Sequence, residues 1–180
     1  MLFNLIKIVF LFMVAPQCFG GNNYDFRLES FLAIKGEEET LADFQNIKLI
    51  GRERALNGSF SVGIDLTDDI LCSFEAFVFR DGNWNLLPYA AKDITFCELA
   101  KKLLFAYLNP ADYNTNFPQT IEGYCPGRAG EYWIIEAKID TNNWVSFMRR
   151  GMSKFRFHVF KNGKIVGGFE LVGNIVDRVF

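Results

Sequence analysis

The last part of the sequence contains two runs of alternating side chains that meet at Asn162-Gly163. The run FRFHVF precedes this pair, and the run KIVGGFELVGNIV follows it. Asn-Gly between two alternating runs is the strongest short-range signal of a β-hairpin, because both residues accept the positive φ of a type I′ turn. The sequence therefore predicts two long antiparallel strands here.

The same period of two appears in four earlier segments, and each predicts a strand with one buried face. These segments run over residues 24–34, 60–66, 70–80 and 132–139. Within the third, Cys72, Phe74 and Val78 fall on one face and are expected to point into the core. In the fourth, both alternating sets contain large side chains, and we assign Trp133 and Ile135 to the buried face.

A helical pattern replaces the alternation after Pro88. Thr95 lies three residues before Glu98, which is the spacing of a capping box, and apolar residues then follow at helical intervals. These signals predict a helix over about residues 96–108, ended by Asn109-Pro110. Many strands with one helix, without repeated strand-helix alternation, indicate a mainly β fold. We expect an antiparallel β-sandwich or β-cup with the helix packed at its mouth.

The first 20 residues have the build of a secretory signal peptide. Lys7 is followed by an apolar stretch over residues 8–15 and then by small residues at Cys18 and Gly20, after which we expect cleavage. The apolar stretch is too short to span a bilayer, and no later segment has the roughly 18 apolar residues that a membrane helix requires. We therefore predict a secreted, extracellular protein with one domain over residues 21–180 and no transmembrane segment.

Several classes of function are disfavoured by the composition. The chain is nearly neutral, with 19 basic and 21 acidic residues, so there is no electrostatic basis for a nucleic-acid partner. The only histidine, His158, lies in opposite phase to its neighbouring phenylalanines and is expected on the solvent side of a strand. Since no nucleophile with a base and no metal-ligand spacing is present, we expect no catalysis, no cofactor and no metal. Four acidic residues cluster near one predicted connection between strands: Asp65, Asp68, Asp69 and Glu75. We expect them to form a solvated turn rather than a catalytic pair of carboxylates.

Two kinds of covalent modification are suggested by the sequence. Removal of the signal peptide leaves Cys72, Cys97 and Cys125, and in an oxidising compartment three cysteines suggest one disulfide and one unpaired thiol. The count alone does not say which two pair. Asn57-Gly58-Ser59 is an N-glycosylation sequon, which makes Asn57 a candidate glycosylation site, and the same residues would also suit a tight turn.

The chain contains 20 phenylalanines, an unusually high number. Such rings either fill a core or line a pocket for an apolar ligand. Composition does not separate these two alternatives.

Five segments carry a resemblance to a known family. They are LIGRERALNGSFSV, LLPYAAKDITFCELAKKL, NFPQ, CPGRAGEYWI and SKFRFHVFKNGKIVGGFELVGNIVDRV, and together they extend from about Ile47 to Val179. In their order and spacing they resemble the insect CheA-type secreted chemosensory proteins, which are themselves similar to the ganglioside activator and other lipid-recognition β-sandwich proteins. The larger disulfide set of the ganglioside activator is missing from this chain.

The resemblance implies a secreted, non-enzymatic carrier of a lipid-like or hydrophobic chemosensory ligand of the pheromone type. It also implies that the ligand is presented to a chemosensory receptor or channel. Finally, it implies a disulfide between Cys97 and Cys125. With the phases of the strands and the helix, it gives a set of expected ligand-binding residues: Phe74, Val78, Leu99, Leu103, Trp133, Ile135, Phe157 and Phe169. Each of these side chains would serve equally well in ordinary packing, because a sandwich core and a cavity wall use the same face. The alternative is an extracellular interaction module with a filled core that acts on a receptor or channel.

Overall fold

The computed structural model describes residues 23–88, 90–104, 113–118, 120, 123, 125–145 and 148–178. The strands in these ranges are β1 (Tyr24–Ile34), β2 (Ala42–Asp43), β3 (Lys48–Ile50), β4 (Ala55–Val62), β5 (Ile70–Arg80), β6 (Asn83–Leu86), β7 (Ala91–Thr95), β8 (Asn114–Thr115), β9 (Gly130–Ala137), β10 (Gly151–Lys161) and β11 (Lys164–Asp177). A short helix, α2 (Phe96–Leu99), continues into a π-helical turn, η1 (Ala100–Leu104). The fold is therefore mainly β, as the sequence predicts, and the helix predicted over residues 96–108 is α-helical only over Phe96–Leu99 and π-helical over Ala100–Leu104. The predicted signal peptide and the predicted helical residues 105–108 lie outside the described residues.

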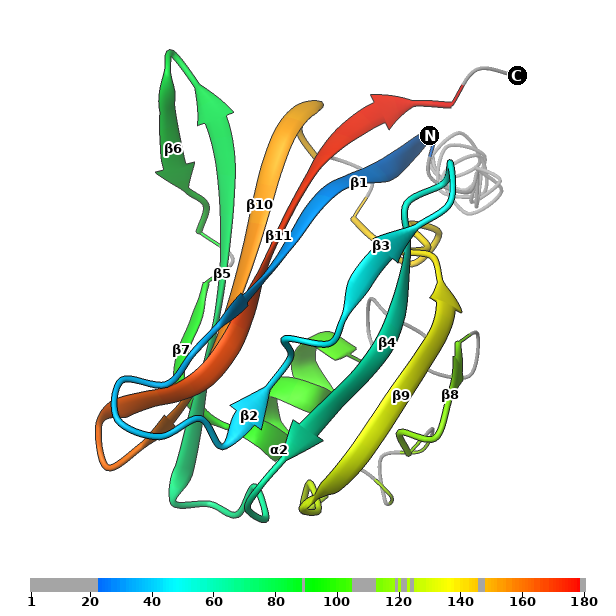
Figure 1. Ribbon diagram of the computed structural model, residues 1–180. Helices are drawn as coiled ribbons and strands as arrows, with labels where there is room; N and C mark the ends of the chain where they lie inside the picture. Colours follow the sequence, from blue (N-terminus) through cyan, green and yellow to red (C-terminus); the bar gives the residue numbers. More distant parts are fainter. Residues whose placement is uncertain are drawn as a thin grey trace, which may run out of the picture.

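The strands form one sheet in the order β6-β5-β10-β11-β2-β4-β9-β8, with β1 paired to β11, β3 to β4 and β7 to β5. The pairing of β2 with β11 is parallel, and the other pairings between these strands are antiparallel. Figure 1 shows the sheet folding over at β2 into two groups of strands. We call β1, β5, β6, β7, β10 and β11 the β10 layer, on the left in Figure 1, and β3, β4, β8 and β9 the β9 layer, on the right.

The turn between β10 and β11 confirms the hairpin predicted at its Asn-Gly pair. Asn162 and Gly163 have φ angles of 52° and 76°, so both occupy the left-handed region that a two-residue hairpin turn requires. Asp81 and Gly82, with φ angles of 52° and 77°, make the equivalent turn between β5 and β6. These two turns join β10 to β11 and β5 to β6, and β5 pairs with β10 to complete this part of the β10 layer.

The start of α2 also follows the prediction. The Thr95 Oγ1 atom accepts a hydrogen bond of 3.2 Å from the backbone N–H of Glu98, which satisfies one of the free donors at the helix start. The helix buries Phe96 and Leu99. It lies against β5 and β7, so its apolar side faces the interior of the fold.

The buried side chains fall into two clusters. The first lies beside α2 and joins the two layers; it contains Ala42, Ile47, Phe60, Val62, Leu66, Ile70, Cys72, Phe96, Leu99, Ala100, Tyr132, Phe157, Val159 and Val166. The second surrounds the start of β1 and contains Tyr24, Phe26, Leu28, Ala76, Phe155 and Ile175. Trp144 packs onto the second cluster, with its ring centroid 5.6 Å from that of Phe26 and 5.5 Å from that of Phe155. The segment after β9 therefore covers this end of the core.

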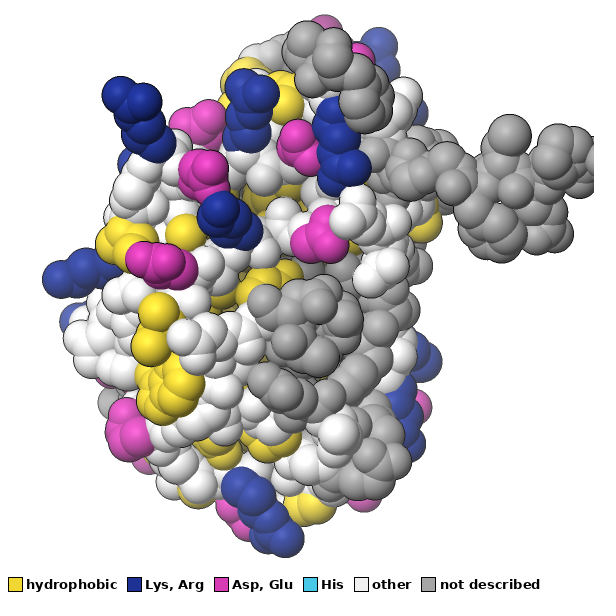
Figure 2. All heavy atoms as spheres, turned by 90° about the vertical axis from the view of Figure 1, so that its right-hand side faces the viewer, with side chains coloured by type: hydrophobic (Ala, Val, Ile, Leu, Met, Phe, Trp, Pro, Cys, Tyr) yellow, Lys and Arg dark blue, Asp and Glu magenta, His cyan; other side chains and the backbone are white. Residues whose placement is uncertain are grey.

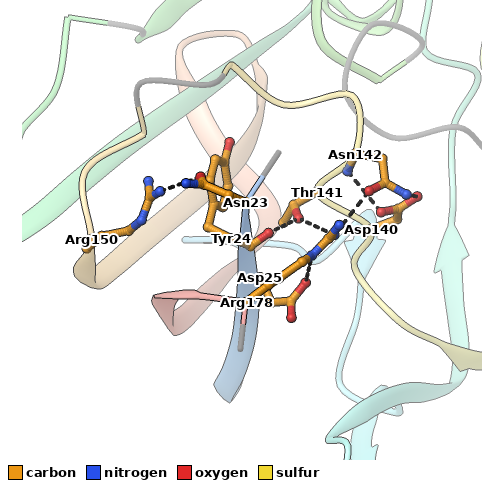
Figure 3. A network of polar contacts seen from close by, with 8 residues as sticks. All are labelled: Asn23, Tyr24, Asp25, Asp140, Thr141, Asn142, Arg150 and Arg178. Atoms are coloured by element: carbon orange, nitrogen blue, oxygen red, sulfur yellow. Dashed lines mark hydrogen bonds and ion pairs between the residues drawn. The ribbon is translucent and has the colours of Figure 1, made fainter. Parts of the chain in front are cut away.

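A network of polar contacts fastens that covering segment to the start of β1 (Figure 3). The Tyr24 hydroxyl donates to the carbonyl of Val145 at 2.6 Å, and the Thr141 hydroxyl donates to the carbonyl of Tyr24 at 2.7 Å. Arg178, just after β11, forms an ion pair of 2.6 Å with Asp25 and also donates to Thr141. The beginning of β1, the segment after β9 and the end of β11 are thereby held together.

Candidate functional site

The inward face of the β10 layer carries a row of three phenylalanines. Phe157 on β10 lies opposite Phe74 on β5 and opposite Phe169 on β11. The ring centroids of Phe157 and Phe169 are 5.3 Å apart. Residues at directly opposite positions share one face of a sheet, so all three rings face the β9 layer. Three of the expected ligand-binding residues thus lie side by side.

Phe44, in the connection between β2 and β3, bridges this row to the opposite layer. Its ring centroid lies 5.1 Å from that of Phe169 and 5.2 Å from that of Phe60 on β4. Phe60 in turn stacks on Tyr132 of β9 at 5.3 Å. An aromatic surface therefore runs from one layer to the other. No pattern in the sequence points to Phe44, because it lies in an irregular segment without periodicity.

Several of these inward-facing side chains are only half-buried. Phe74, Phe169 and Phe44 belong to the interior surface, yet each keeps part of its surface accessible to solvent. Leu103 on η1 is half-buried in the same way and packs against the same cluster. A fully packed core would bury such residues almost completely. These four side chains therefore lie at the edge of the first cluster, where part of each remains exposed.

The two remaining predicted residues of the interior differ from this group. Leu99 on α2 is buried within the first cluster, where it packs with the residues just described. Val78 is also buried, but it belongs to neither cluster and lies opposite Ser153, near the far end of β5. The structure thus brings Phe74, Leu99, Leu103, Phe157 and Phe169 together and leaves Val78 apart.

The predicted orientation of Trp133 and Ile135 is wrong. Their side chains are 38% and 45% exposed, whereas Tyr132 is buried and Ile134 is half-buried against the core. The register with β4 explains the difference, because Phe60, which faces inward, lies opposite Tyr132. Trp133 is then on the outer face. An interior site on this strand would use Tyr132 and Ile134, which the sequence analysis did not select.

Cys97 and Cys125 lie next to each other. They are present as thiols linked by a side-chain hydrogen bond, and burial together with this bond raises the pKa of Cys125 to about 11. Cys72 is fully buried on the inward face of β5, where burial raises its pKa to about 12. The proximity of Cys97 and Cys125 is what the predicted disulfide requires. The disulfide itself remains a prediction.

The segment after Cys125 is built around a close approach to the helix. A side-chain carbon on Gly127 would lie 2.9 Å from the ring of Phe96, so only glycine fits under that ring. The Gly127 carbonyl accepts a hydrogen bond of 2.6 Å from the N–H of Leu66. Asp65 accepts from the N–H of Ala129 and from Arg128, and these bonds lower the pKa of the Asp65 carboxyl. The chain is thus fixed at several points before β9 begins.

Charged side chains on the outer face of the β10 layer form a row of ion pairs. Arg156 contacts Glu170 at 2.8 Å, Lys92 contacts Glu75 at 2.9 Å, and Lys154 lies 3.6 Å from Glu170. The prediction that Glu75 belongs to an acidic turn is wrong, because it lies within β5. These acids are neutralised by neighbouring cations, so none is left as a free acid or base.

His158 lies on the same outer face, between Ser73 of β5 and Gly168 of β11. It is half-buried, and burial, together with nearby Arg156, lowers its pKa. Among the described residues, no group of three or more His, Cys, Asp or Glu side chains is placed to hold a metal ion. None of the helices in the described ranges is long and apolar enough to cross a membrane.

A shallow surface pocket of about 140 Å³ lies beside the turn between β10 and β11. It is lined mainly by charged and polar residues, among them Glu38, Glu39, Lys161 and Lys164. Sites for small organic ligands are usually larger, at roughly 300–1,000 Å³, and mostly apolar. The interior aromatic surface is therefore the better candidate site.

No protein-family model matches the chain, and no curated protein is significantly similar to it. The resemblance described above therefore rests on the quoted segments alone.

Proposed function

We propose that the protein is a secreted, non-enzymatic carrier of a lipid-like or hydrophobic chemosensory ligand, which it presents to a receptor. The ligand would lie between the β10 layer and the β9 layer. The observation that carries this function is the half-buried state of inward-facing Phe74, Leu103 and Phe169, which leaves apolar surface inside the fold accessible. Each methylene of an alkyl chain placed there would contribute about 0.8 kcal/mol before ordering costs are subtracted.

The placement of the helix is consistent with this role. Leu99 and Leu103 cover one side of the interior, and the neighbouring Cys97 lies against Cys125. A disulfide at this point would fix the start of the helix beside the segment that leads into β9. The family resemblance gives the same kind of function, together with the pheromone-type ligand and the extracellular location.

Native mass spectrometry and solvent extraction of the secreted protein test this function. We expect a co-purified apolar molecule, and competitive binding of the fluorescent probe N-phenyl-1-naphthylamine to the extracted protein. Leu103→Glu places a carboxylate at the interior surface and is expected to weaken probe binding at least about tenfold, which corresponds to about 1.4 kcal/mol.

Leu86→Glu is the matched control for this variant. It is the same substitution at a leucine that is 48% exposed on the outer face of the β10 layer. We expect it to leave probe binding unchanged. An extract without lipid, together with wild-type protein that does not bind the probe, would contradict the carrier function. Circular dichroism of both variants verifies that the fold is retained.

A second function, an interaction module acting on a receptor or channel, is favoured by the β5–β6 hairpin. Phe79 and Leu86 are 45% and 48% exposed there, and the Lys154 ammonium lies 4.7 Å from the ring centroid of Trp84. Exposed apolar side chains beside a cation are common features of binding surfaces. Loss of binding to chemosensory membranes in Leu86→Glu, with probe binding absent in the wild type, would support this second function over the first.

A further inference from the structure

The outer face of the β9 layer carries an exposed apolar patch, which we define as Trp133 and Ile135. Both side chains lie on β9 and are more than one-third exposed. Figure 2 views the molecule from the side on which β8 and β9 lie, and it shows hydrophobic side chains at the surface among polar ones. Large apolar side chains grouped on an outer face call for a covering group.

The glycosylation sequon lies on the same face. Ser59 is directly opposite Trp133, and Gly58 is opposite Ile134, which faces inward. Alternation along β4 therefore places Asn57 and Ser59 on the outer face. Asn57 lies where the register of β4 and β9 shifts, between Leu56 opposite Ala137 and Gly58 opposite Ile134, so it adjoins Ile135 and Glu136 of β9. The hydrogen bond from the N–H of Glu136 to Asn57 also places the sequon beside the patch.

The side-chain amide of Asn57 is oriented for modification. Its Oδ1 atom accepts a hydrogen bond of 3.4 Å from the N–H of Glu136, while its Nδ2 atom donates to none of the described residues. No buried side-chain nitrogen among the described residues lacks a partner, so this Nδ2 atom is accessible to solvent. Nδ2 is the atom to which an N-linked glycan attaches, and the bond through Oδ1 would be kept.

The fold accounts for the middle residue of the sequon but not for its last one. Gly58 has a φ of 138°, and a side-chain carbon there would lie 2.1 Å from the carbonyl oxygen of Asn46. Asn57-Gly58 is thus part of an irregular strand and not the tight turn that the sequence also allowed. The Ser59 hydroxyl makes no hydrogen bond within the described part of the chain, so packing does not require it. Recognition of the sequon does require a hydroxyl at this position.

We propose that Asn57 carries an N-linked glycan whose first sugars lie over Trp133 and Ile135 and shield them from solvent. The Nδ2 atom attacks the anomeric carbon of a lipid-linked oligosaccharide diphosphate. The N–C bond forms as the C–O bond breaks, the lipid diphosphate leaves with the electron pair, and the amide loses one proton. The apolar C–H face of a sugar ring matches the flat indole of Trp133. This inference rests on the secretory route that the proposed function includes.

The opposite flank of Asn57 is less suited to a sugar. Across β3, Asn57 faces Lys48, an exposed charged residue. Ile50, which is 36% exposed, is the exposed apolar side chain on that strand, whereas Leu49 packs against the second cluster. Neither Lys48 nor Ile50 offers an aromatic face. Ile50→Ala is therefore the matched control for Trp133→Ala.

A double-mutant cycle on secreted protein tests this arrangement. Ser59→Ala removes the sequon hydroxyl, and intact mass verifies the glycan in the wild type and its loss in the variant. Trp133→Ala should raise the equilibrium constant of unfolding in both backgrounds. We expect this increase to be at least about twofold larger in the glycosylated protein than in the Ser59→Ala background. Ile50→Ala is expected to show no such coupling. The fluorescence of Trp133 is obtained as the difference between the wild type and Trp133→Phe. Its quenching by acrylamide should increase when the glycan is absent.

Three outcomes would overturn the inference: no glycan in the intact mass, additive effects of Trp133→Ala and Ser59→Ala, or unchanged quenching of Trp133. Additivity with a glycan present would indicate that the patch is left free for a protein partner. Probe binding, measured on the same samples, reports on the carrier function separately. A failure of either idea is therefore distinguishable from a failure of the other.

Discussion

The strands β10 and β9 have similarly apolar sequences, but only the first one has the orientation expected from its pattern. In β10, Phe155 and Phe157 face inward, and the intervening positions hold Lys154, Arg156 and His158. In β9 both alternating sets hold large apolar side chains, Tyr132 and Ile134 on one face and Trp133 and Ile135 on the other. Period two tells which residues share a face, but it identifies the buried face only when the other face is polar.

The two strands also reach their places by different routes. β10 is joined to β11 by a two-residue turn and pairs along its length with β5 and β11. β9 follows a segment held by Gly127, Asp65 and the neighbouring Cys125, and its partner β4 is distant in sequence. Local turn chemistry fixes the register of β10, whereas contacts distant along the chain fix that of β9.

The largest expected effect separates these two strands directly. Phe157→Ala should lower the free energy of unfolding by about 3–5 kcal/mol, because it removes a buried ring from the phenylalanine row. Trp133→Ala should cost about 1 kcal/mol or less, since its side chain is on the outer face. Urea or guanidinium unfolding of the two variants measures both values. A larger loss for Trp133→Ala than for Phe157→Ala would mean that β9 has the opposite orientation.

Most of the fold was predictable because its signals are local. The bounds of β1, the Asn162-Gly163 turn and the Thr95 cap depend on residues a few positions apart. Those signals act through backbone geometry and need no knowledge of distant contacts. The inward faces of β5 and β10 followed because their outer positions are polar or charged.

The candidate site was only partly predictable for the same reason. Phe74, Phe157 and Phe169 were correctly placed on the inner face, and their side-by-side arrangement required the pairing of three strands. Phe44 lies in a segment without periodicity, and Tyr132 was assigned to the wrong face. Neither position is defined until β4 and β9 are paired.

The next largest effect tests how β9 is attached. If Cys97 and Cys125 form a disulfide, it closes a loop of about 29 residues and contributes roughly 3.6 kcal/mol by the chain-entropy relation. Cys97→Ser, Cys125→Ser and the double variant should then each lose about that amount, because any one of them removes the same bridge. Unfolding with and without reductant measures it.

Peptide mapping without reduction provides the control for this prediction. It should find Cys97 joined to Cys125 and Cys72 as a thiol, since Cys72 is buried and its raised pKa makes it unreactive. An unfolding midpoint that reductant does not change, or a bridge to Cys72, would contradict the prediction. β9 would then depend on noncovalent contacts alone.

A smaller effect is expected at the glycine that packs under the helix. Gly127→Ala would force a methyl group against the ring of Phe96 and should cost about 1–3 kcal/mol. Gly130→Ala is the matched control, because its nearest contact is an ordinary 3.5 Å from the ring of Tyr132, and about 0.5 kcal/mol or less is expected. Equal losses in thermal or urea unfolding would show that the close approach to Phe96 does not anchor the segment before β9.

The smallest effect concerns the polar face that distinguishes β10 from β9. The pKa of His158 is lowered in the folded protein by burial and by Arg156, against about 6.5 in the unfolded chain. Between these two values the unfolded state binds more protons, so the free energy of unfolding should fall as the pH decreases through 6.5 and level off below the folded pKa. Glu75 of β5 and Glu170 of β11, which face the same site, oppose this shift without cancelling it. His158→Gln should remove this part of the pH dependence, whereas Trp133→Phe on the outer face of β9 should keep it. Urea unfolding between pH 5 and 8, at intervals of roughly half a unit, compares the slopes, and a wild-type slope equal to that of His158→Gln would contradict the prediction.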